Sequence, residues 1–332
     1  MPINRVRRRE FITLLFGAAL APSRDALGQA SAKVYRLGSL DPARPLSANS
    51  PDATTLLAAL AERGYTLGRN LAYDARASGG DNSKLPEVLK DFEASRVDVL
   101  VTIGYPATLA AKTAGIPTVA AAGVGDPVGT GLVNSLAQPG GTVTGISDNA
   151  TMLSTKRLSF LKELLPNLRR VAMLWNADDL GMSLRYEASA TAARSIGVTV
   201  QPLGVREPHD FAKAFETMDR EPPDAILMMS DTLTVLNRKY VFDYAAAKRL
   251  PAIYESEPYV RAGGLMSYGG DRKELFQRAA ALVDRIFKGA KPADLPFEQP
   301  TRYLFMINLG VAKAMGLEIP PNLLALADAV IE

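Results

Sequence analysis

The stretch Ala122-Gly-Val-Gly-Asp-Pro-Val-Gly-Thr-Gly-Leu132 decides the fold, because it joins a buried strand to a loop with little side-chain bulk. The apolar run over residues 117–122 is short enough to be a strand. Glycines let backbone N–H groups approach a bound molecule, and ligands of open α/β sheets bind at the carboxyl ends of strands. We therefore expect Gly123, Gly125 and Asp126 to line a ligand cleft. The simpler alternative is a tight turn between two sheet elements.

The composition is that of a two-domain globular protein. The chain has 332 residues, of which 47% are hydrophobic and 22% charged, and this length fits two domains. It contains no cysteine, which excludes disulfides, thiolate metal sites, cysteine nucleophiles and a lipid-modified cysteine anchor.

The N-terminus has the pattern of an export signal over residues 1–30. Basic residues precede an uncharged run from 11 to 22, and small residues follow. Arg8 and Arg9, followed by Phe11, have the twin-arginine form. Residues 1–28 hold five arginines and two acidic residues, which accounts for the net charge of +3 of the whole chain. The mature protein is then neutral, which argues against a nucleic-acid partner and predicts a soluble, periplasmic protein without a lipid anchor.

Hydrophobic runs alternate with amphipathic segments along the whole chain. This alternation predicts βαβ units and parallel sheets, an α/β fold class. In the first half we expect strands at residues 34–40, 71–75, 97–102 and 117–122, with helices near 53–60, 83–92 and 105–114. In the second half we expect strands at 171–175, 198–203, 225–229, 252–254, 265–268 and 303–308, with helices near 154–165, 186–196, 211–218, 235–247 and 274–288.

The sequence lacks the residues of the common catalytic and cofactor sites. His209 is the one histidine, and no Gly-x-Ser-x-Gly motif accompanies it. Neither the phosphate-loop nor the dinucleotide fingerprint is present. We therefore expect no catalytic residue, no metal and no cofactor.

Polar and aromatic residues gather where the predicted strands end. Hydroxyls and backbone N–H groups suit a carboxylate, acidic groups suit an ammonium, and aromatic faces suit an apolar body. The alternative is that each is structural, with Asp126 capping a turn and Trp175 or Tyr254 in the core. The ligand-binding candidates are Tyr105, Gly123, Gly125, Asp126, Trp175, Asn176, Ser230, Asp231, Tyr254, Glu255 and Tyr268.

A set of short motifs resembles one known family. The motifs are Arg63-Gly-Tyr-Thr-Leu-Gly-Arg-Asn-Leu71, Val97-Asp-Val-Leu-Val-Thr102, Gly125-Asp-Pro-Val128, the run from Gly131 to Gly145, Lys156-Arg-Leu158, Pro251-Ala-Ile-Tyr254, Ala262-Gly-Gly-Leu-Met-Ser-Tyr-Gly269 and Gly289-Ala-Lys-Pro-Ala-Asp-Leu-Pro296. Over residues 35–332 the chain resembles the solute-binding proteins of ABC transporters, in the family that includes tryptophan- and tyrosine-binding proteins.

The resemblance implies a type I periplasmic binding fold of two Rossmann-like lobes joined by a multi-strand hinge. Lobe 1 would comprise residues 33–147 and about 271–300, and lobe 2 residues 148–270 and about 301–332. It also implies a function: a monomer captures a small amino-acid-like or aromatic carboxylate solute by hinge closure and delivers it to an ABC permease in the inner membrane.

Two other functions fit the residues less well. An exported hydrolase or isomerase would use Asp126, Asp231 or Glu255 as a general base, but no nucleophile–base pair is evident. A ligand-sensing subunit would hand its occupied form to a membrane receptor, and the sequence does not separate sensing from transport.

Overall fold

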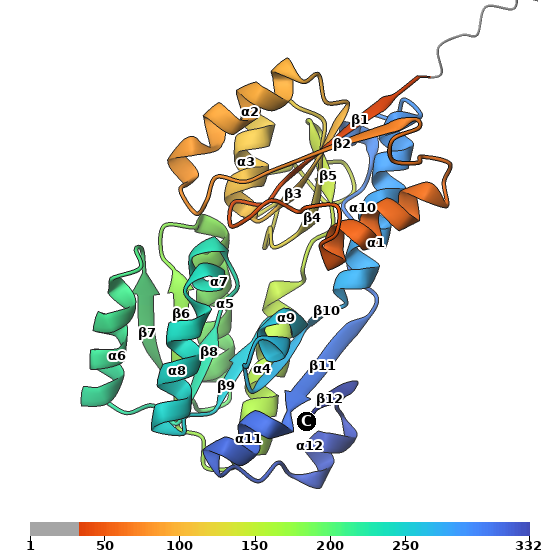
Figure 1. Cartoon of the computed structure of the whole chain (residues 1–332). Helices are drawn as coiled ribbons and strands as arrows, with labels where there is room; N and C mark the ends of the chain where they lie inside the picture. The colour runs from red at the N-terminus through yellow and green to blue at the C-terminus, as the bar shows by residue number, and fades with distance from the viewer. Residues whose placement is uncertain (1–32) are drawn as a thin grey trace, which may run out of the picture. The chain divides into compact units, whose positions relative to one another are not determined.

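A computed structural model describes residues 33–332. Figure 1 colours these residues along the chain. The predicted export signal, with Arg8, Arg9 and Phe11, lies outside the described residues. In the described part of the chain, no helix has the length and apolar character needed to cross a membrane.

The first sheet has five parallel strands in the order β2-β1-β3-β4-β5. β2 is added on one side of β1, and β3, β4 and β5 are added on the other side. Because the direction of strand addition reverses at β1, the connecting helices cover both faces of the sheet. Its strands are β1 (Tyr35–Leu40), β2 (Leu71–Arg76), β3 (Val99–Ile103), β4 (Thr118–Ala122) and β5 (Val143–Gly145). Its helices are α1 (Pro51–Ala61), η2 (Asn82–Lys84), α2 (Leu85–Ala94), α3 (Tyr105–Thr113) and, from far along the chain, α10 (Arg272–Phe287).

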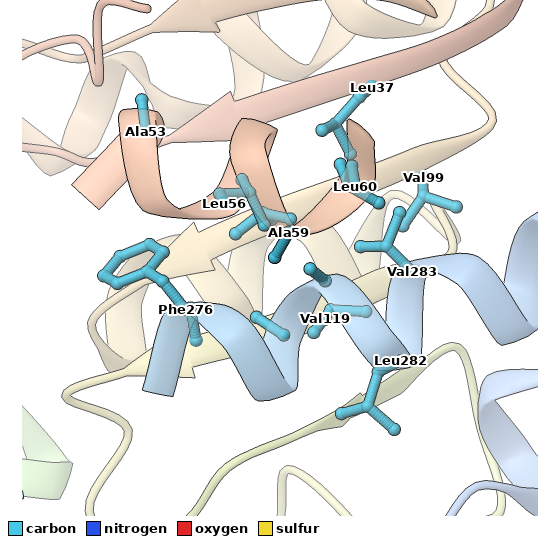
Figure 2. Packing of buried hydrophobic residues seen from close by; sticks show 14 of the residues in the cluster. Leu37, Ala53, Leu56, Ala59, Leu60, Val99, Val119, Phe276, Leu282 and Val283 are labelled. Atoms are coloured by element: carbon cyan, nitrogen blue, oxygen red, sulfur yellow. The ribbon is translucent and has the colours of Figure 1, made fainter. Parts of the chain in front are cut away.

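Each face of the first sheet has its own core. Figure 2 shows α1 and α10 packing together, with Leu56 and Phe276 among the buried side chains. The opposite face is covered by α2 and α3 through residues such as Phe92. Helix α1 begins where it does because Ser50 caps it, accepting a hydrogen bond from the Ala53 N–H, and proline occupies the first turn.

The second sheet has seven strands in the order β12-β11-β10-β9-β8-β6-β7, all parallel except for the antiparallel β10–β11 pair. Its strands are β6 (Arg170–Asn176), β7 (Thr199–Val205), β8 (Ala225–Met228), β9 (Ala252–Tyr254), β10 (Met266–Gly270), β11 (Tyr303–Asn308) and β12 (Ala329–Ile331). Its helices are α4 (Ala150–Leu164), α5 (Leu180–Ser195), α6 (Asp210–Arg220), α7 (Thr232–Leu236), α8 (Arg238–Lys248), α9 (Glu257–Arg261), α11 (Leu309–Met315) and α12 (Pro321–Ala325).

The side-chain alternation of β6 divides the second core. Met173 and Trp175 join the cluster that α4 and α5 cover, whereas Ala172 and Leu174 join the cluster beneath α6 and α8. Both faces of this strand are apolar, as expected for a strand that is buried on both sides.

The two sheets are connected by several backbone segments. After β5 the chain leaves the first sheet, and Ser147 N–H donates to the Glu298 carbonyl. Asp271 N–H donates to the Arg302 carbonyl, where the chain passes from β10 to α10 and back into β11. The short 3-10 turn η3 (Pro292–Asp294) lies on the return path. The lobe boundaries predicted from the sequence stay a prediction.

Most predicted elements are confirmed, and the differences have local causes. The helix expected at 186–196 begins at Leu180, because Asp179 caps it. The helix expected at 235–247 is two helices, because a capping box of Asp231 and Thr234 starts α7 and a break at Asn237 separates it from α8. The short α9 and β12 were not predicted.

Gly145 allows β5 to pack against β4. A side chain there would overlap the Ala120 carbonyl oxygen and approach the Ala120 nitrogen to 2.8 Å. Gly145→Ala should therefore lower the free energy of unfolding by about 1–3 kcal/mol, the usual range for overpacking, as measured by urea denaturation. Gly141→Ala is the control, since no atom lies within 4 Å of a Cβ at that position. Equal midpoints for the two variants would contradict the prediction.

Candidate functional site

Three neighbouring parallel strands end at one edge of the second sheet. The strands β6, β8 and β9 are adjacent. Asn176 is the last residue of β6, Ser230 and Asp231 come after β8, and Glu255 comes after β9. Asn176 Nδ2 donates to Asp231 Oδ2 at 2.5 Å, and Ser230 N–H donates to Glu255 Oε2 at 2.8 Å. The structure therefore brings four of the candidates together.

Glu255 is held between two buried arginines that the sequence analysis did not select. Its Oε1 accepts from Arg157 Nη1 at 2.9 Å and its Oε2 from Arg185 Nη1 at 2.5 Å. All three side chains are only 3–4% exposed. Arg185 Nη2 also pairs with Asp148, directly after the segment that leaves β5, and Arg157 Nε donates to the Tyr268 carbonyl at 2.8 Å.

The charges of this network balance within the protein. Two guanidinium groups, Arg157 and Arg185, face two carboxylates, Glu255 and Asp148. Burial alone raises the pKa of Glu255, but Arg185, Arg157 and the Ser230 N–H outweigh it and hold the pKa below its usual value. Glu255 is therefore ionised near neutral pH, and both of its oxygens already accept hydrogen bonds from the protein.

Two further carboxyl groups cap helices at the same edge. Asp179 accepts from Met182 N–H at 3.1 Å at the start of α5, and Asp231 accepts from Thr234 N–H at 2.9 Å at the start of α7. Burial and then the nearby Asp231 charge raise the pKa of Asp179 to about 7. Burial also raises the pKa of Asp231. Burial therefore favours the neutral form of both carboxyl groups, and a cation placed beside them would favour the ionised form.

Aromatic side chains lie beside the acidic groups. Trp175 stacks on Tyr186 with ring centroids 3.7 Å apart and an interplanar angle of 6°. Its indole N–H is buried and has no partner among the described residues. Burial, followed by the Asp179 charge, raises the pKa of Tyr105, a residue that is 8% exposed. A Cβ at Gly181 would lie 3.2 Å from the Tyr105 Cβ, so this ring lies against the beginning of α5.

Tyr254 and Tyr268 are placed apart from the polar cluster. Tyr254 is 1% exposed, stacks on Tyr259 and lines an apolar cavity of about 130 Å³ between α8 and α11. Tyr268 is half-buried and meets Phe160 edge to face. Its backbone carbonyl accepts a hydrogen bond from Arg157 Nε, so Tyr268 contacts the polar cluster through its main chain.

The glycine-rich loop is held by its own aspartate. Asp126 Oδ1 accepts from the N–H groups of Val128 and Gly129, both at 3.0 Å, and its side chain is exposed. Gly123 and Gly125 have φ of +73° and +68°, a conformation that favours glycine. A Cβ at Gly125 would lie 3.3 Å from the Gly181 carbonyl oxygen. The capping role considered for Asp126 in the sequence is therefore present in the structure.

The described residues offer no cluster of His, Cys, Asp and Glu that could hold a metal ion. His209 is exposed at the start of α6, with its ring nitrogens 3.3 and 3.4 Å from the carboxylates of Glu207 and Asp210. It forms no side-chain hydrogen bond to the N-terminal turn of the helix.

A model of the family described as ABC transporter substrate binding protein matches residues 45–331. The chain belongs to this family. A tyrosine-binding protein of Clostridioides difficile is 26% identical over 262 residues, which cover 78% of this chain and 75% of the relative. Family membership identifies a solute-binding protein and names no catalytic activity.

Solved structures of similar proteins have the same architecture. A Streptococcus ABC domain solved in complex with L-Trp is 26% identical, with a TM-score of 0.80 over 90% of this chain and 100% of that chain. A conserved domain protein of Vibrio cholerae is 25% identical, with a TM-score of 0.83 and the same coverage. The fold is the type I periplasmic binding fold, as predicted from the sequence.

The raised pKa of Asp179 makes stability depend on pH. A carboxyl group whose pKa is higher in the folded state binds more protons when folded, so its stabilising contribution is present at low pH and is lost as the pH rises from about 4 to about 7. Asp179→Asn keeps a good helix cap but carries no charge. Relative to wild type, this variant should gain of the order of 2 kcal/mol between pH 5 and pH 8, as measured by urea denaturation.

The control for this experiment is Asp178→Asn, because Asp178 is the exposed neighbour that pairs with Arg206 on the surface. A difference between Asp179→Asn and wild type that stays constant across this pH range would contradict the prediction.

Proposed function

We propose that the protein is the exported solute-binding component of an ABC importer. It captures a small organic solute between two lobes and delivers it to a permease in the inner membrane. Family membership supports this role. The observation that carries it is the polar strand-end cluster, because strand ends are where ligands of α/β sheets bind.

The capture mechanism is hinge closure. The chain passes between the sheets at residues 146–149, 271 and 299–302, and these segments are the hinge. A solute that contacts both lobes binds the closed form more tightly than the open form and shifts the population toward it. The permease then distinguishes the occupied protein by its closed form.

The solute that fits the edge is amino-acid-like or an aromatic carboxylate. The stacked Trp175 and Tyr186 offer an apolar surface, and Asp179 with Asp231 favours an amino group. The names of the relatives agree with this class, since one is a tyrosine-binding protein and another was solved with L-Trp.

A thermal-shift screen tests the ligand class. The twenty amino acids, aromatic acids, sugars and divalent metal ions are added separately to the purified protein. An amino acid or aromatic acid at one hundred times its Kd should stabilise the folded state by about 2.7 kcal/mol, by mass action, and raise the melting temperature. Sugars and metal ions are the negative controls. Stabilisation by these alone would refute the proposed class.

We also propose export by the twin-arginine route, based on Arg8, Arg9 and Phe11. Replacing both arginines by lysine keeps the charge but removes the motif, and it should leave the protein inside the cell. Fractionation of cells, followed by detection of the protein, measures this. Arg5→Lys with Arg7→Lys is the matched control. Undiminished export of the Arg8, Arg9 variant would indicate the general secretory route.

A further inference from the structure

An apolar cavity of about 130 Å³ lies between α8 and α11, at the opposite end of the strands from the polar cluster. Leu250 and Ala252 line it where β9 begins, and Leu265 lines it just before β10 begins. These two strands are parallel, so their amino ends lie at the same edge of the sheet. The polar cluster occupies the carboxyl ends, and the cavity is therefore a separate place in the fold.

Short side chains leave this space open. Five of the eleven lining residues are alanine or glycine, and they come from α8, β9, α11 and the turn before β10: Ala245, Ala246, Ala252, Gly263 and Ala314. Folded interiors are otherwise close-packed, with few voids larger than a water molecule. An apolar cavity of about 150 Å³ stays free of water and accepts benzene. This cavity therefore has room for about one small aromatic ring.

Tyr254 supplies the one hydroxyl group among the lining residues. The residue is 1% exposed, and its ring stacks on Tyr259 with 5.3 Å between centroids and meets Phe242 edge to face at 5.2 Å. The Tyr254 hydroxyl forms no hydrogen bond with a described residue, and burial raises its pKa above the usual value. Because a buried tyrosine hydroxyl normally has a partner, this one is available to a ligand atom.

The cavity is open toward the surface of α8. A neighbouring hollow of about 460 Å³ shares Phe242, Ala246 and Gly263 with it and continues past Lys239 and Asp243. These two charged residues are exposed and pair with each other at 2.7 Å. A small molecule can therefore reach the cavity past the shared residues, through an entrance whose charges are already compensated.

The lining decides which chemistry fits. The other ten lining residues carry no charge and no hydroxyl, so a charged molecule would lose its hydration without gaining a counterion. A bare hydrocarbon would leave the hydroxyl of Tyr254 unpaired. We propose that the cavity is a second binding site, for an uncharged, benzene-sized molecule with one hydrogen-bonding oxygen, as in a phenol. This site goes beyond solute capture at the strand ends and does not depend on it.

Two internal arrangements compete with this proposal. In the first, the walls of the cavity close on themselves, and the space admits no molecule. In the second, the Tyr254 hydroxyl bonds to that of Tyr259, which is also unpaired but lies beside Ser230 and Thr234, near the carboxyl ends of the strands. The first arrangement binds nothing, and the second gives no preference for a ligand that carries an oxygen.

An NMR titration of the full chain distinguishes these cases, with phenol, benzene and benzoate as probes. Phenol should bind at one site per chain, and benzene about three- to tenfold more weakly, as expected for the loss of one neutral hydrogen bond. Benzoate should not displace phenol, because its charge would be buried without a partner. Equal affinities for phenol and benzene would overturn the inference, and so would the absence of binding by both.

Removing the hydroxyl tests its role. Tyr254→Phe should weaken phenol binding by about tenfold and leave benzene binding unchanged, because phenol then buries an unpaired hydroxyl. The hydroxyl of Tyr254 makes no hydrogen bond to a described residue, so we expect this variant to fold, and circular dichroism checks it. If Tyr254→Phe weakens phenol and benzene equally, the hydroxyl does not select the ligand and the inference is wrong.

Filling the space locates the site. Ala246→Leu and Ala314→Leu enlarge exposed lining residues on the two facing helices, and each should abolish binding of phenol and benzene. Ala247→Leu is the matched control, because Ala247 is the exposed next residue of α8 and does not line the cavity. Undiminished phenol binding by both filled variants would place phenol elsewhere and overturn the inference. The two variants are independent, so the loss of one through misfolding leaves the other to decide.

A competition experiment separates this site from the proposed solute site. The amino acid or aromatic acid with the largest shift in the thermal screen should not displace phenol, because the two sites lie at opposite ends of the strands. Displacement would place phenol in the solute site and overturn the inference while leaving solute capture intact. If phenol binds as described and nothing in the thermal screen does, the proposed ligand class fails and the second site stands.

Discussion

The second sheet depends on a single buried carboxylate, Glu255, placed between Arg157 and Arg185. Around it meet α4, α5, the ends of β8 and β9, the backbone of β10 and the segment that follows β5. A buried ion pair contributes little net stability, but the loss of one partner leaves an uncompensated charge and costs about 3–5 kcal/mol. The network is therefore a constraint on geometry: the elements must keep the positions in which every charge has its partner.

The same edge carries a second constraint, from helix capping. Asp179 and Asp231 sit where strands give way to helices, and each accepts the free N–H groups of a first turn. Their burial opposes ionisation, whereas the positive ends of the helices and the capping bonds favour it. The Asp231 charge also raises the pKa of Asp179, so the ionisation of these two capping groups is coupled.

The sequence predicted the strands well because their signal is local. A run such as residues 225–229 is apolar, short and bounded by polar residues, and such runs formed strands throughout. The buried network was not predicted, because Arg157 and Arg185 occur on helices whose other charged residues face solvent. Only tertiary packing distinguishes a buried arginine from an exposed one. Asn176, Ser230, Asp231 and Glu255 were selected because a parallel sheet aligns strand ends, which is a property of topology.

The contrast between Tyr254 and Glu255 shows how far such reasoning extends. Both follow the same apolar run, but side chains alternate along a strand, so neighbours point to opposite sides. Tyr254 enters the core beneath α8 and Glu255 meets the arginines. The position of a residue at a strand end predicts only the region of the sheet in which it lies. The alternation of side chains then decides which residue enters the core and which joins the polar cluster. Because Glu255 is satisfied internally, the protein's own hydrogen bonds hold the ends of β8 and β9 in place.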